Sequence, residues 1–372
     1  MFNQLSAYKG KTVLVTGNTG FKGSWMTMML LHFKANVVGY ALQPEVNGKP
    51  VYDELRLNDK VNQYIEDIRS YKEVKKCIEE TQPDIIFHMA AQPLVRESYQ
   101  EPYATLDVNI MGTLNLLEAV RKLKLQTKII CITSDKSYQN QEWLFGYREN
   151  DPLGGNDPYS ASKAAAEIII SSYRNSFFNP EKFAEHGVML ASVRAGNVIG
   201  GGDWADDRIV PDSIRSLKKG EKIFVRNPLA TRPWQHVLEP TGGYLLLGAK
   251  MFENESNAET YCSAFNFGPL ISSNLPVQAL VDEIIHNWGS GEWTYNPEDA
   301  VHEASLLNLT IEKAYHLLDW FPVWDFKDGV KHTTEWYKQQ FNGGDMVEFT
   351  NKQIVDYIKT YELRDKDKTV AS

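Results

Sequence analysis

The feature that most constrains the fold is a glycine loop, GNTGFKG (residues 17–23), set between two apolar segments. It follows KTVLVT (11–16), a β-branched run of strand length, and precedes SWMTMMLLHF (24–33), an apolar run of helix length. In a strand–turn–helix unit the first glycine permits a tight turn, the second lets a pyrophosphate approach the backbone, and the last lets helix and strand pack closely. The G-x-x-G-x-x-G spacing indicates a dinucleotide-binding loop. A glycine-rich turn without a ligand is the alternative.

Strand-like and helix-like segments alternate along the first half of the chain. The strand-like runs are 11–16, 36–41, 85–89, 128–133 and 188–193, and the helical runs are 21–33, 71–81, 105–123 and 159–178. This alternation predicts an α/β fold with a Rossmann-type, doubly wound parallel sheet.

The pattern changes after about Asn197, where shorter pieces with more Gly, Pro and Trp indicate a smaller C-terminal lobe closing over the sheet. We expect a mainly cofactor-binding domain at 1–196 and a mainly substrate-binding lobe at 197–350, interleaved with the first. The polar end at 364–372 is expected to fray.

Composition excludes several classes of partner. The 372 residues carry a net charge of −9 without a basic block, which disfavours nucleic acid and anionic membranes. Cys77, Cys131 and Cys262 form no C-x-x-C pair, and no His/Cys/Asp cluster has the spacing of metal ligands. Neither a signal layout nor an apolar run of membrane-spanning length is present. We expect a cytoplasmic protein that holds no metal.

The end of the second strand leaves the cofactor open between NAD and NADP. An NAD site usually places an acid there for the ribose 2′-hydroxyl, but GYALQP (39–44) has none before Glu45. Asp67, followed by Ile68, is placed after the third strand as the acid beside the adenine. A solvated turn residue is the alternative for Asp67.

Tyr159 and Lys163 are four residues apart at the start of a predicted helix, and therefore lie on one face. An unperturbed tyrosine has a pKa of ~10. A lysine ammonium and a positive nicotinamide ring nearby would favour the phenolate and lower that pKa, so that Tyr159 could take a proton from a substrate hydroxyl. An ordinary amphipathic pair is the alternative, but the glycine loop and the serine after the fifth strand occur at suitable intervals.

Together, these motifs resemble those of the extended short-chain dehydrogenases/reductases that act on nucleotide sugars, over about residues 8–345. The motifs are GNTGFKG, HMAAQ (88–92), ITSDK (132–136), Tyr159-x-x-x-Lys163, AGNVIGGGDW (195–204), RPWQHVLEP (232–240) and NFGP (266–269). Within that family these motif sequences are most similar to those of the 4,6-dehydratases, and the resemblance favours CDP-glucose as the substrate. The choice of nucleobase rests on the resemblance alone.

The resemblance implies roles for individual residues. Ser134 would hydrogen-bond the sugar's 4-hydroxyl, Tyr159 would be the base for oxidation, and Lys163 would hold the nicotinamide ribose and tune Tyr159. Asn109 matches an asparagine that kinks a helix, and a structural and a catalytic role are both open for it. The cofactor-binding set, besides Tyr159 and Lys163, is Thr16, Gly17, Asn18, Gly20, Phe21, Gly23, Asp67, Ile68, Ala90, Ala91, Gln92 and Thr133.

Asp135 and Lys136 concern the step after oxidation, in which a 4-ketosugar loses water across C5 and C6. Asp135 stands where the related dTDP-glucose dehydratases carry the acid for the departing 6-hydroxyl. Those relatives carry Glu next as the C5 base, whereas this chain has Lys136. Lys136 could act as a neutral base, or stay charged and stabilise the enolate. The alternative is that Lys136 only forms a salt bridge and has no chemical role.

A nucleoside diphosphate brings about two negative charges to this acidic protein, so arginines must gather in the cleft. Arg232 matches the family's diphosphate-binding arginine, and the other candidates are Arg96, Asn197, Arg208, Arg226 and His236. Surface arginines and a packed histidine are the alternatives. The glycines at 200–202 are expected to let the nucleotide approach the backbone.

The motifs leave three alternative functions to consider. A dTDP- or GDP-sugar dehydratase would use the same chemistry. A nucleotide-sugar 4-epimerase would need Ser134, Tyr159 and Lys163 but no acid/base pair, so Asp135 with Lys136 argues against it. A non-catalytic cofactor-sensing protein would commonly lose the Tyr or Lys that this chain keeps. Family analogy implies a homodimer or homotetramer built on the helices at 105–123 and 159–178.

Overall fold

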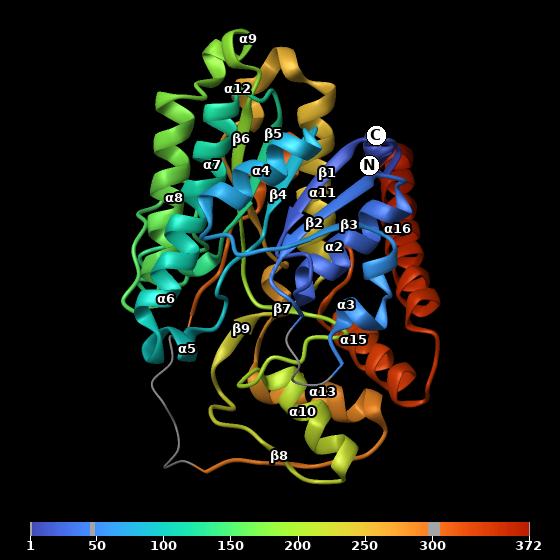
Figure 1. The fold of residues 1–372 in the computed structure, drawn as a ribbon. Coiled ribbons are helices and arrows are strands. Elements are labelled where there is room, and N and C mark those ends of the chain that lie inside the picture. Colours follow the sequence, from blue (N-terminus) through green and yellow to red (C-terminus); the bar gives the residue numbers. More distant parts are fainter. Residues whose placement is uncertain (1, 45–48, 297–305, 372) are drawn as a thin grey trace.

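The computed structural model describes residues 2–44, 49–296 and 306–371, with side chains described for 4–44, 49–296 and 306–364. Its centre is a seven-stranded, all-parallel sheet in the order β11-β6-β5-β4-β1-β2-β3 (Figure 1). The strands are β1 (Thr12–Thr16), β2 (Asn36–Ala41), β3 (Asn62–Ile65), β4 (Ile85–His88), β5 (Lys128–Ile132), β6 (Met189–Ala195) and β11 (Ala264–Phe267). The predicted α/β, doubly wound fold is confirmed.

Helices cover both faces of the sheet. Successive residues of a strand point to opposite faces, so Val13 and Val15 pack towards α2 (Phe21–His32) and α11 (Leu238–Glu253). Leu14 packs on the other face, against a layer formed by α4 (Tyr71–Thr81), α7 (Gly112–Leu123) and α8 (Pro158–Ser176). The two buried apolar clusters fix the sheet between these layers.

Two strands were not among the strand-like runs, although a third strand was expected before Asp67, and both have weak local signals. β3 reads NQYI, and its side chains are only partly buried or exposed. β11 reads AFNF and lies beyond Asn197, where the alternating pattern is lost. Only pairing with β2 and β6, respectively, makes them strands.

The chain after residue 197 contributes to two regions. α11 and β11 belong to the central layers, while a smaller region at the bottom of Figure 1 contains α10 (Ile209–Lys219), α13 (Val277–Trp288) and one short strand, β8 (Ile223–Phe224). This half of the chain also forms three short strand pairs. The pairs are β7 (Val198–Ile199) with β10 (Gln235–His236), β8 (Ile223–Phe224) with β13 (Trp293–Thr294), and β9 (Thr231–Pro233) with β12 (Asn274–Pro276).

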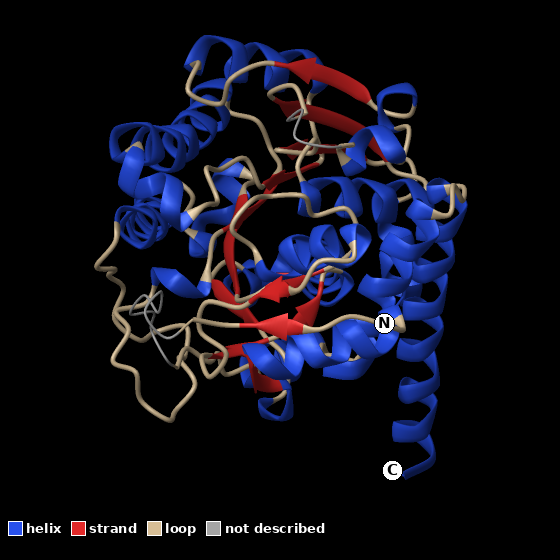
Figure 2. Ribbon diagram, turned by 90° about the horizontal axis from the view of Figure 1, so that it is seen from below, coloured by secondary structure: helices blue, strands red, loops and turns tan. Residues whose placement is uncertain are grey.

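The C-terminal helices α15 (Phe326–Phe341) and α16 (Met346–Ala371) follow, and α16 runs along one side of the molecule (Figures 1 and 2). The predicted frayed tail at 364–372 overlaps the end of α16, and its side chains from residue 365 lie outside the described part. The remaining helices are α1 (Phe2–Leu5), α3 (Val51–Glu54), α5 (Val95–Gln100), α6 (Pro102–Leu106), α9 (Phe183–His186), α12 (Ala258–Tyr261) and α14 (Glu312–Leu318).

All three cysteines are buried as free thiols, and burial raises the pKa of Cys77 to about 12. Across residues 2–44, 49–296 and 306–371, no helix is both long and apolar enough to cross a membrane.

The order of the strands places the functional candidates at one edge. Chain order reverses between β1 and β4, and ligands of doubly wound sheets bind in the crevice at the carboxyl ends of strands at such a switch point. The glycine loop follows β1, Ala90 follows β4, and Ser134 follows β5.

Candidate active site

The glycine loop has the shape that a dinucleotide needs. Gly17 has a φ of +73°, and a Cβ there would lie 2.8 Å from the Ala90 nitrogen; a Cβ on Gly23 would lie 2.2 Å from the Gly17 carbonyl oxygen. A Cβ on Gly20 would meet only the Gly17 oxygen, at 3.4 Å. The chain itself thus requires glycine at two positions but not at Gly20, the residue that caps α2 without a side-chain cap. Open backbone at a helix N-terminus fits a pyrophosphate.

Two of the predicted cofactor-binding residues, Thr16 and Asn18, hold this loop in place through hydrogen bonds. The Thr16 hydroxyl accepts hydrogen bonds from the backbone nitrogens of Met89 and Ala90, both at 3.1 Å. Asn18 is fully buried and donates to the Gln63 amide oxygen at 2.6 Å. Together these bonds tie the ends of β1 and β4 to each other and the loop to β3.

His88, to which sequence reasoning gave no role, joins the same framework. Its two ring nitrogens lie 2.9 Å from the Thr16 hydroxyl and 3.1 Å from the Thr113 hydroxyl. Burial, followed by the Lys163 ammonium, lowers the pKa of His88 to about 3, so the ring is neutral. Its position in HMAAQ at a strand end was the available signal.

Asn109 lies in a π-helical turn, Asp107–Met111, that divides the predicted helix at 105–123 into α6 and α7. Its side chain accepts from the Gln92 nitrogen at 2.8 Å and donates to the Gln92 oxygen at 3.1 Å and to the Ser162 hydroxyl at 2.8 Å. This buried bridge joins the loop after β4 to α8, which favours the structural alternative for Asn109.

The residues predicted to lie beside the adenine of the cofactor follow β3. Asp67 pairs with Arg69 at 2.6 Å, and this hydrogen bond lowers the pKa of Asp67. The neighbouring Ile68 is buried against Gly112. Glu45, the first acid after β2, lies outside the described residues.

Ser134, Asp135 and Tyr159 form the buried centre of the candidate site. The Ser134 hydroxyl donates to Asp135 Oδ1 at 3.0 Å and accepts from the Lys136 nitrogen at 3.2 Å. Asp135 is 3 % exposed, and its Oδ2 has no hydrogen-bond partner in the described part of the chain. Asp157 caps α8 by accepting from the Ser160 nitrogen, which sets Tyr159 and Lys163 in the first turns of that helix.

Burial controls the charges of these groups. It raises the pKa of Asp135, against the opposing effects of Lys136 and the Ser134 hydrogen bond. It raises the pKa of Tyr159 to about 12, although a hydrogen bond with Ser134 opposes the shift, and it lowers the pKa of Lys163 to about 8. In the chain alone the pKa of Tyr159 is therefore raised by burial rather than lowered, and the predicted lowering by Lys163 together with the bound cofactor stays a prediction. The nicotinamide charge, which the prediction also invoked, is not part of the chain.

The predicted arginines separate into two groups. Arg208 pairs with Asp203 at 2.8 Å, and its charge opposes the rise in the pKa of Tyr159. The charge of Arg232 likewise acts on Asp135, so both arginines interact electrostatically with the catalytic candidates.

Arg96 and Arg226 instead meet at Asp207, at 2.6 and 3.2 Å. This arrangement links α5 to the loop before α10. Asn197 is partly exposed after β6, and its carbonyl accepts from the Gln235 nitrogen at 3.2 Å.

Two predicted features face the core. His236 is 1 % exposed and packs edge-on against Trp25 and Trp324, an environment that favours the packed alternative for this histidine. The glycines at 200–202 are buried, and a Cβ on Gly201 would lie 2.0 Å from Trp336. Close packing explains these glycines, in place of the expected approach of a nucleotide.

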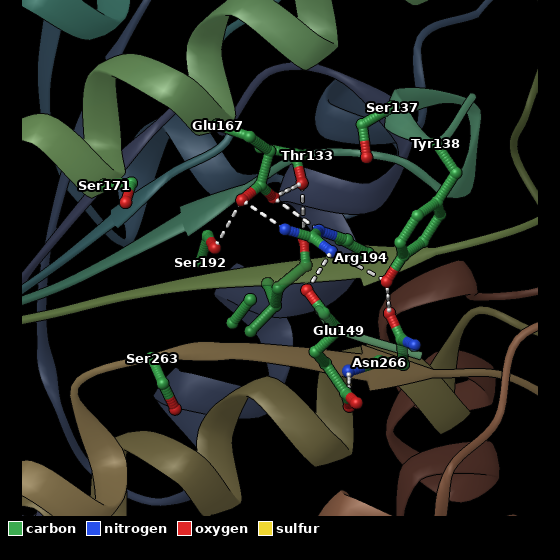
Figure 3. A network of polar contacts seen from close by, with 12 residues as sticks. Thr133, Ser137, Tyr138, Glu149, Glu167, Ser171, Ser192, Arg194, Ser263 and Asn266 are labelled. Atoms are coloured by element: carbon green, nitrogen blue, oxygen red, sulfur yellow. Dashed lines mark hydrogen bonds and ion pairs between the residues drawn. The ribbon is translucent and has the colours of Figure 1, made fainter. Parts of the chain in front are cut away.

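A buried polar network, drawn in Figure 3, includes Thr133, the residue before Ser134. Arg194 of β6 donates to Glu167 of α8 through Nε at 3.0 Å and Nη2 at 2.8 Å, and to the Tyr138 hydroxyl at 2.7 Å. Glu167 also accepts from the hydroxyls of Thr133 at 2.5 Å and Ser192 at 2.8 Å. The Thr133 side chain is thus engaged in this network.

We expect Glu167→Gln to lower the free energy of unfolding by about 3–5 kcal/mol, because it leaves the Arg194 guanidinium buried without its counter-charge. Burial would raise the pKa of Glu167, but Arg194 and the hydrogen bonds outweigh it, and the pKa lies below the usual value. The contribution of Glu167 is therefore present at neutral pH and is lost as the pH falls through its folded pKa. Urea titrations at several pH values measure this effect.

Glu292→Gln is the matched control, because Glu292 pairs with Lys222 on the open surface, where their side chains are 71 % and 65 % exposed. The urea midpoint of this variant should stay close to that of the parent. Similar losses in both variants would contradict the special role of the buried pair.

Comparison with known proteins agrees with this geometry. The family model for GDP-mannose 4,6 dehydratase matches residues 14–333. CDP-glucose 4,6-dehydratase of Salmonella typhimurium is 45 % identical over 353 residues, covering 94 % of this chain and 97 % of that protein. Human dTDP-D-glucose 4,6-dehydratase is 26 % identical, covering 91 % of this chain and 93 % of that protein.

Solved structures show the same fold. A dTDP-glucose 4,6-dehydratase from Bacillus anthracis, in complex with NAD, superposes with a TM-score of 0.72 at 22 % identity, covering 91 % of this chain and all of that one. An epimerase from Methanothermobacter thermautotrophicus gives 0.75 at 22 % identity, covering 91 % of this chain and 96 % of that one. The chain belongs to the GDP-mannose 4,6-dehydratase family of nucleotide-sugar enzymes within the extended short-chain dehydrogenases/reductases.

Proposed function

We propose that this chain converts CDP-glucose to CDP-4-keto-6-deoxyglucose and water, with NAD as its cofactor. The choice of nucleotide is supported by the identity with the Salmonella CDP-glucose 4,6-dehydratase over nearly the whole of both chains. The observation that carries the reaction is Asp135, a buried carboxyl group beside Ser134 and Tyr159, one oxygen of which has no hydrogen-bond partner among the described residues.

The first half of the reaction is an oxidation at C4. NAD, held by the glycine loop and by residues beside β4, supplies the hydride chemistry when bound. Tyr159 would take the proton of the 4-hydroxyl, and Ser134 would orient that hydroxyl. Lys163, which is charged below a pH of about 8, would favour the phenolate of Tyr159.

The second half removes water. Because burial raises the pKa of Asp135, this carboxyl group can hold a proton at a pH where an exposed aspartate has lost it. Its Oδ2, which has no partner in the described part of the chain, is the atom that would give the proton to the departing 6-hydroxyl. Arg232 and Arg208 are proposed to face the substrate's diphosphate.

Lys136 is proposed to act at C5, as a base or as a charge that stabilises the enolate. Lys136→Met should leave C4 oxidation measurable as a transient absorbance of reduced cofactor. It should slow formation of the 4-keto-6-deoxy product by about tenfold or more. Lys136→Arg separates the two roles, because it keeps the positive charge but cannot become a neutral base. Full turnover in the Met variant would rule out a role at C5.

The deciding experiment offers the purified protein CDP-glucose, dTDP-glucose, UDP-glucose and GDP-mannose separately, with and without added NAD. We expect 4-keto-6-deoxy product from CDP-glucose. Product from another sugar would keep the chemistry and reject the nucleotide. No product from any of them would reject the dehydratase, and C4-epimerised sugar would point to the epimerase alternative.

We also propose a cytoplasmic homodimer. The three thiols are buried and unpaired, as expected in a reducing compartment. Tyr103, Met111 and Ile168 are 81 %, 42 % and 59 % exposed on α6, its π-helical turn and α8, the helices assigned to subunit contact by family analogy. Light scattering of the purified chain tests this assembly.

A further inference from the structure

Lys22 is a charged residue of the glycine motif to which sequence analysis gave no role. It lies in the first turn of α2, where the partial positive charge of the helix N-terminus disfavours a cation. Its partly buried side chain donates to the Tyr244 hydroxyl of α11 at 3.5 Å, and Nζ lies 5.6 Å from the centroid of that ring. Among the described side chains no carboxylate forms an ion pair with Lys22. Helix stability therefore does not explain this lysine.

The charges of three residues of the candidate site act on the Lys22 ammonium. After burial, the charges of Lys163 and Arg208 lower the pKa of Lys22 to about 8, while Asp135 opposes them. Asp135 also acts on the Tyr244 hydroxyl. Lys22 of α2 and Tyr244 of α11, which contact each other, thus both interact electrostatically with Asp135 in the turn after β5.

Hydrogen bonding places the acidic proton of Asp135. Oδ1 already accepts from the Ser134 hydroxyl, so the proton of the neutral acid belongs on Oδ2, which has no partner in the described part of the chain. During elimination the C5–H bond breaks, the proton passes to the base at C5, a role for which Lys136 is one candidate, and the electron pair forms the C5=C6 bond. The C6–O bond breaks, and the leaving oxygen takes the Asp135 proton and departs as water. Asp135 is then a buried anion, which is costly without a counter-charge.

We propose that Lys22 is a positioning residue for water elimination: its ammonium, held by the Tyr244 hydroxyl, supplies the counter-charge for the Asp135 carboxylate that forms in this step. The inference rests on the proposed dehydration. It concerns elimination alone, since C4 oxidation does not require Asp135 to change its charge. The charged and titratable groups that act on Asp135, or on which it acts, are Lys136, Arg232, Lys22, Tyr159 and Tyr244.

The test compares Lys22→Met, which removes the charge, with Lys22→Arg, which keeps it. Stopped-flow absorbance of the reduced cofactor follows oxidation, and assay of 4-keto-6-deoxy sugar follows elimination. We expect the Met variant to eliminate water about tenfold more slowly with oxidation little changed, and the Arg variant to recover most of the loss. Tyr244→Phe, which removes only the hydroxyl, should shift elimination in the same direction and by less.

A second measurement needs neither substrate nor cofactor. The infrared carbonyl band of protonated Asp135, assigned by difference from Asp135→Asn, is titrated in the ligand-free parent and in Lys22→Met. A nearby cation favours the carboxylate, so its removal should raise the pKa of Asp135. Elimination, which needs the protonated acid, should then persist to higher pH in the Met variant. A change in packing alone would not produce this coupled shift.

Unchanged elimination and an unchanged Asp135 titration in Lys22→Met would overturn the inference. Equal losses of oxidation and elimination would also overturn it, since they would indicate that Lys22 acts in cofactor binding at the glycine loop. If Lys22→Met does not fold, the same criteria apply to Tyr244→Phe. Absence of product from the parent with every nucleotide sugar would instead reject the proposed function, and the infrared titration would still decide whether Lys22 controls Asp135.

Discussion

Tyr159→Phe is expected to abolish C4 oxidation, with a loss of at least about a hundredfold in the appearance of reduced cofactor, because the ring stays while the proton acceptor is removed. The ring is buried and held by the helix cap at Asp157, so the variant should keep its fold. Burial holds the pKa of Tyr159 at about 12 in the ligand-free chain. The phenolate therefore becomes more populated as the pH rises, and oxidation by the parent should increase towards alkaline pH.

Tyr173→Phe is the matched control for this experiment. Tyr173 lies on the same helix, and its hydroxyl donates to Glu118 at 2.9 Å, away from the candidate site. Rapid-mixing absorbance should give this control the parent's rate of oxidation. Reduced cofactor forming at the parent rate in Tyr159→Phe would show that another group takes the proton.

Asp135→Asn has the second large expected effect: oxidation continues, while release of 4-keto-6-deoxy sugar slows by about a hundredfold or more. The amide has nearly the shape of the acid but cannot supply a carboxyl proton to the leaving hydroxyl. Burial raises the pKa of Asp135, so in the parent elimination should be lost as the pH rises through that pKa. This alkaline limb should be absent from the residual activity of the Asn variant.

Asp151→Asn controls for loss of a nearby carboxylate. Asp151 is 9 % exposed and pairs with Arg148 at 3.1 Å, in the segment that follows the catalytic turn. Its elimination rate should match that of the parent when product is followed over a range of pH. If Asp135→Asn released product as fast as this control, Asp135 would not be the acid.

The layout of the fold could be predicted because its signals are local. Glycine spacing, the alternation of strand and helix, and the four-residue separation of Tyr159 and Lys163 depend on near neighbours in the chain. The same holds for Asp135, which follows Ser134 directly at a strand end. The bounds of β3, which was expected only as a third strand before Asp67, were not predicted, and β11 was missed, because pairing with other strands defines both.

The substrate side was harder to predict, because the type of an arginine does not specify its partner. Arg96 and Arg226 come from segments far apart in the chain and share Asp207, whereas Arg208 and Arg232 act on Tyr159 and Asp135. His236 belongs to a motif of the expected family, yet aromatic rings brought from other elements bury it.

The sequence by itself determined the class of fold, the edge of the sheet that carries the site and the residue types in its catalytic turn, since each of these follows from periodicity or spacing along the chain. Only the tertiary structure decided the charges of the site. Burial raises the pKa values of Asp135 and Tyr159, and the fold lets the charges of Lys22 and Asp135 interact. A pKa depends on desolvation and on charges a few ångströms away in space, and folding alone determines both.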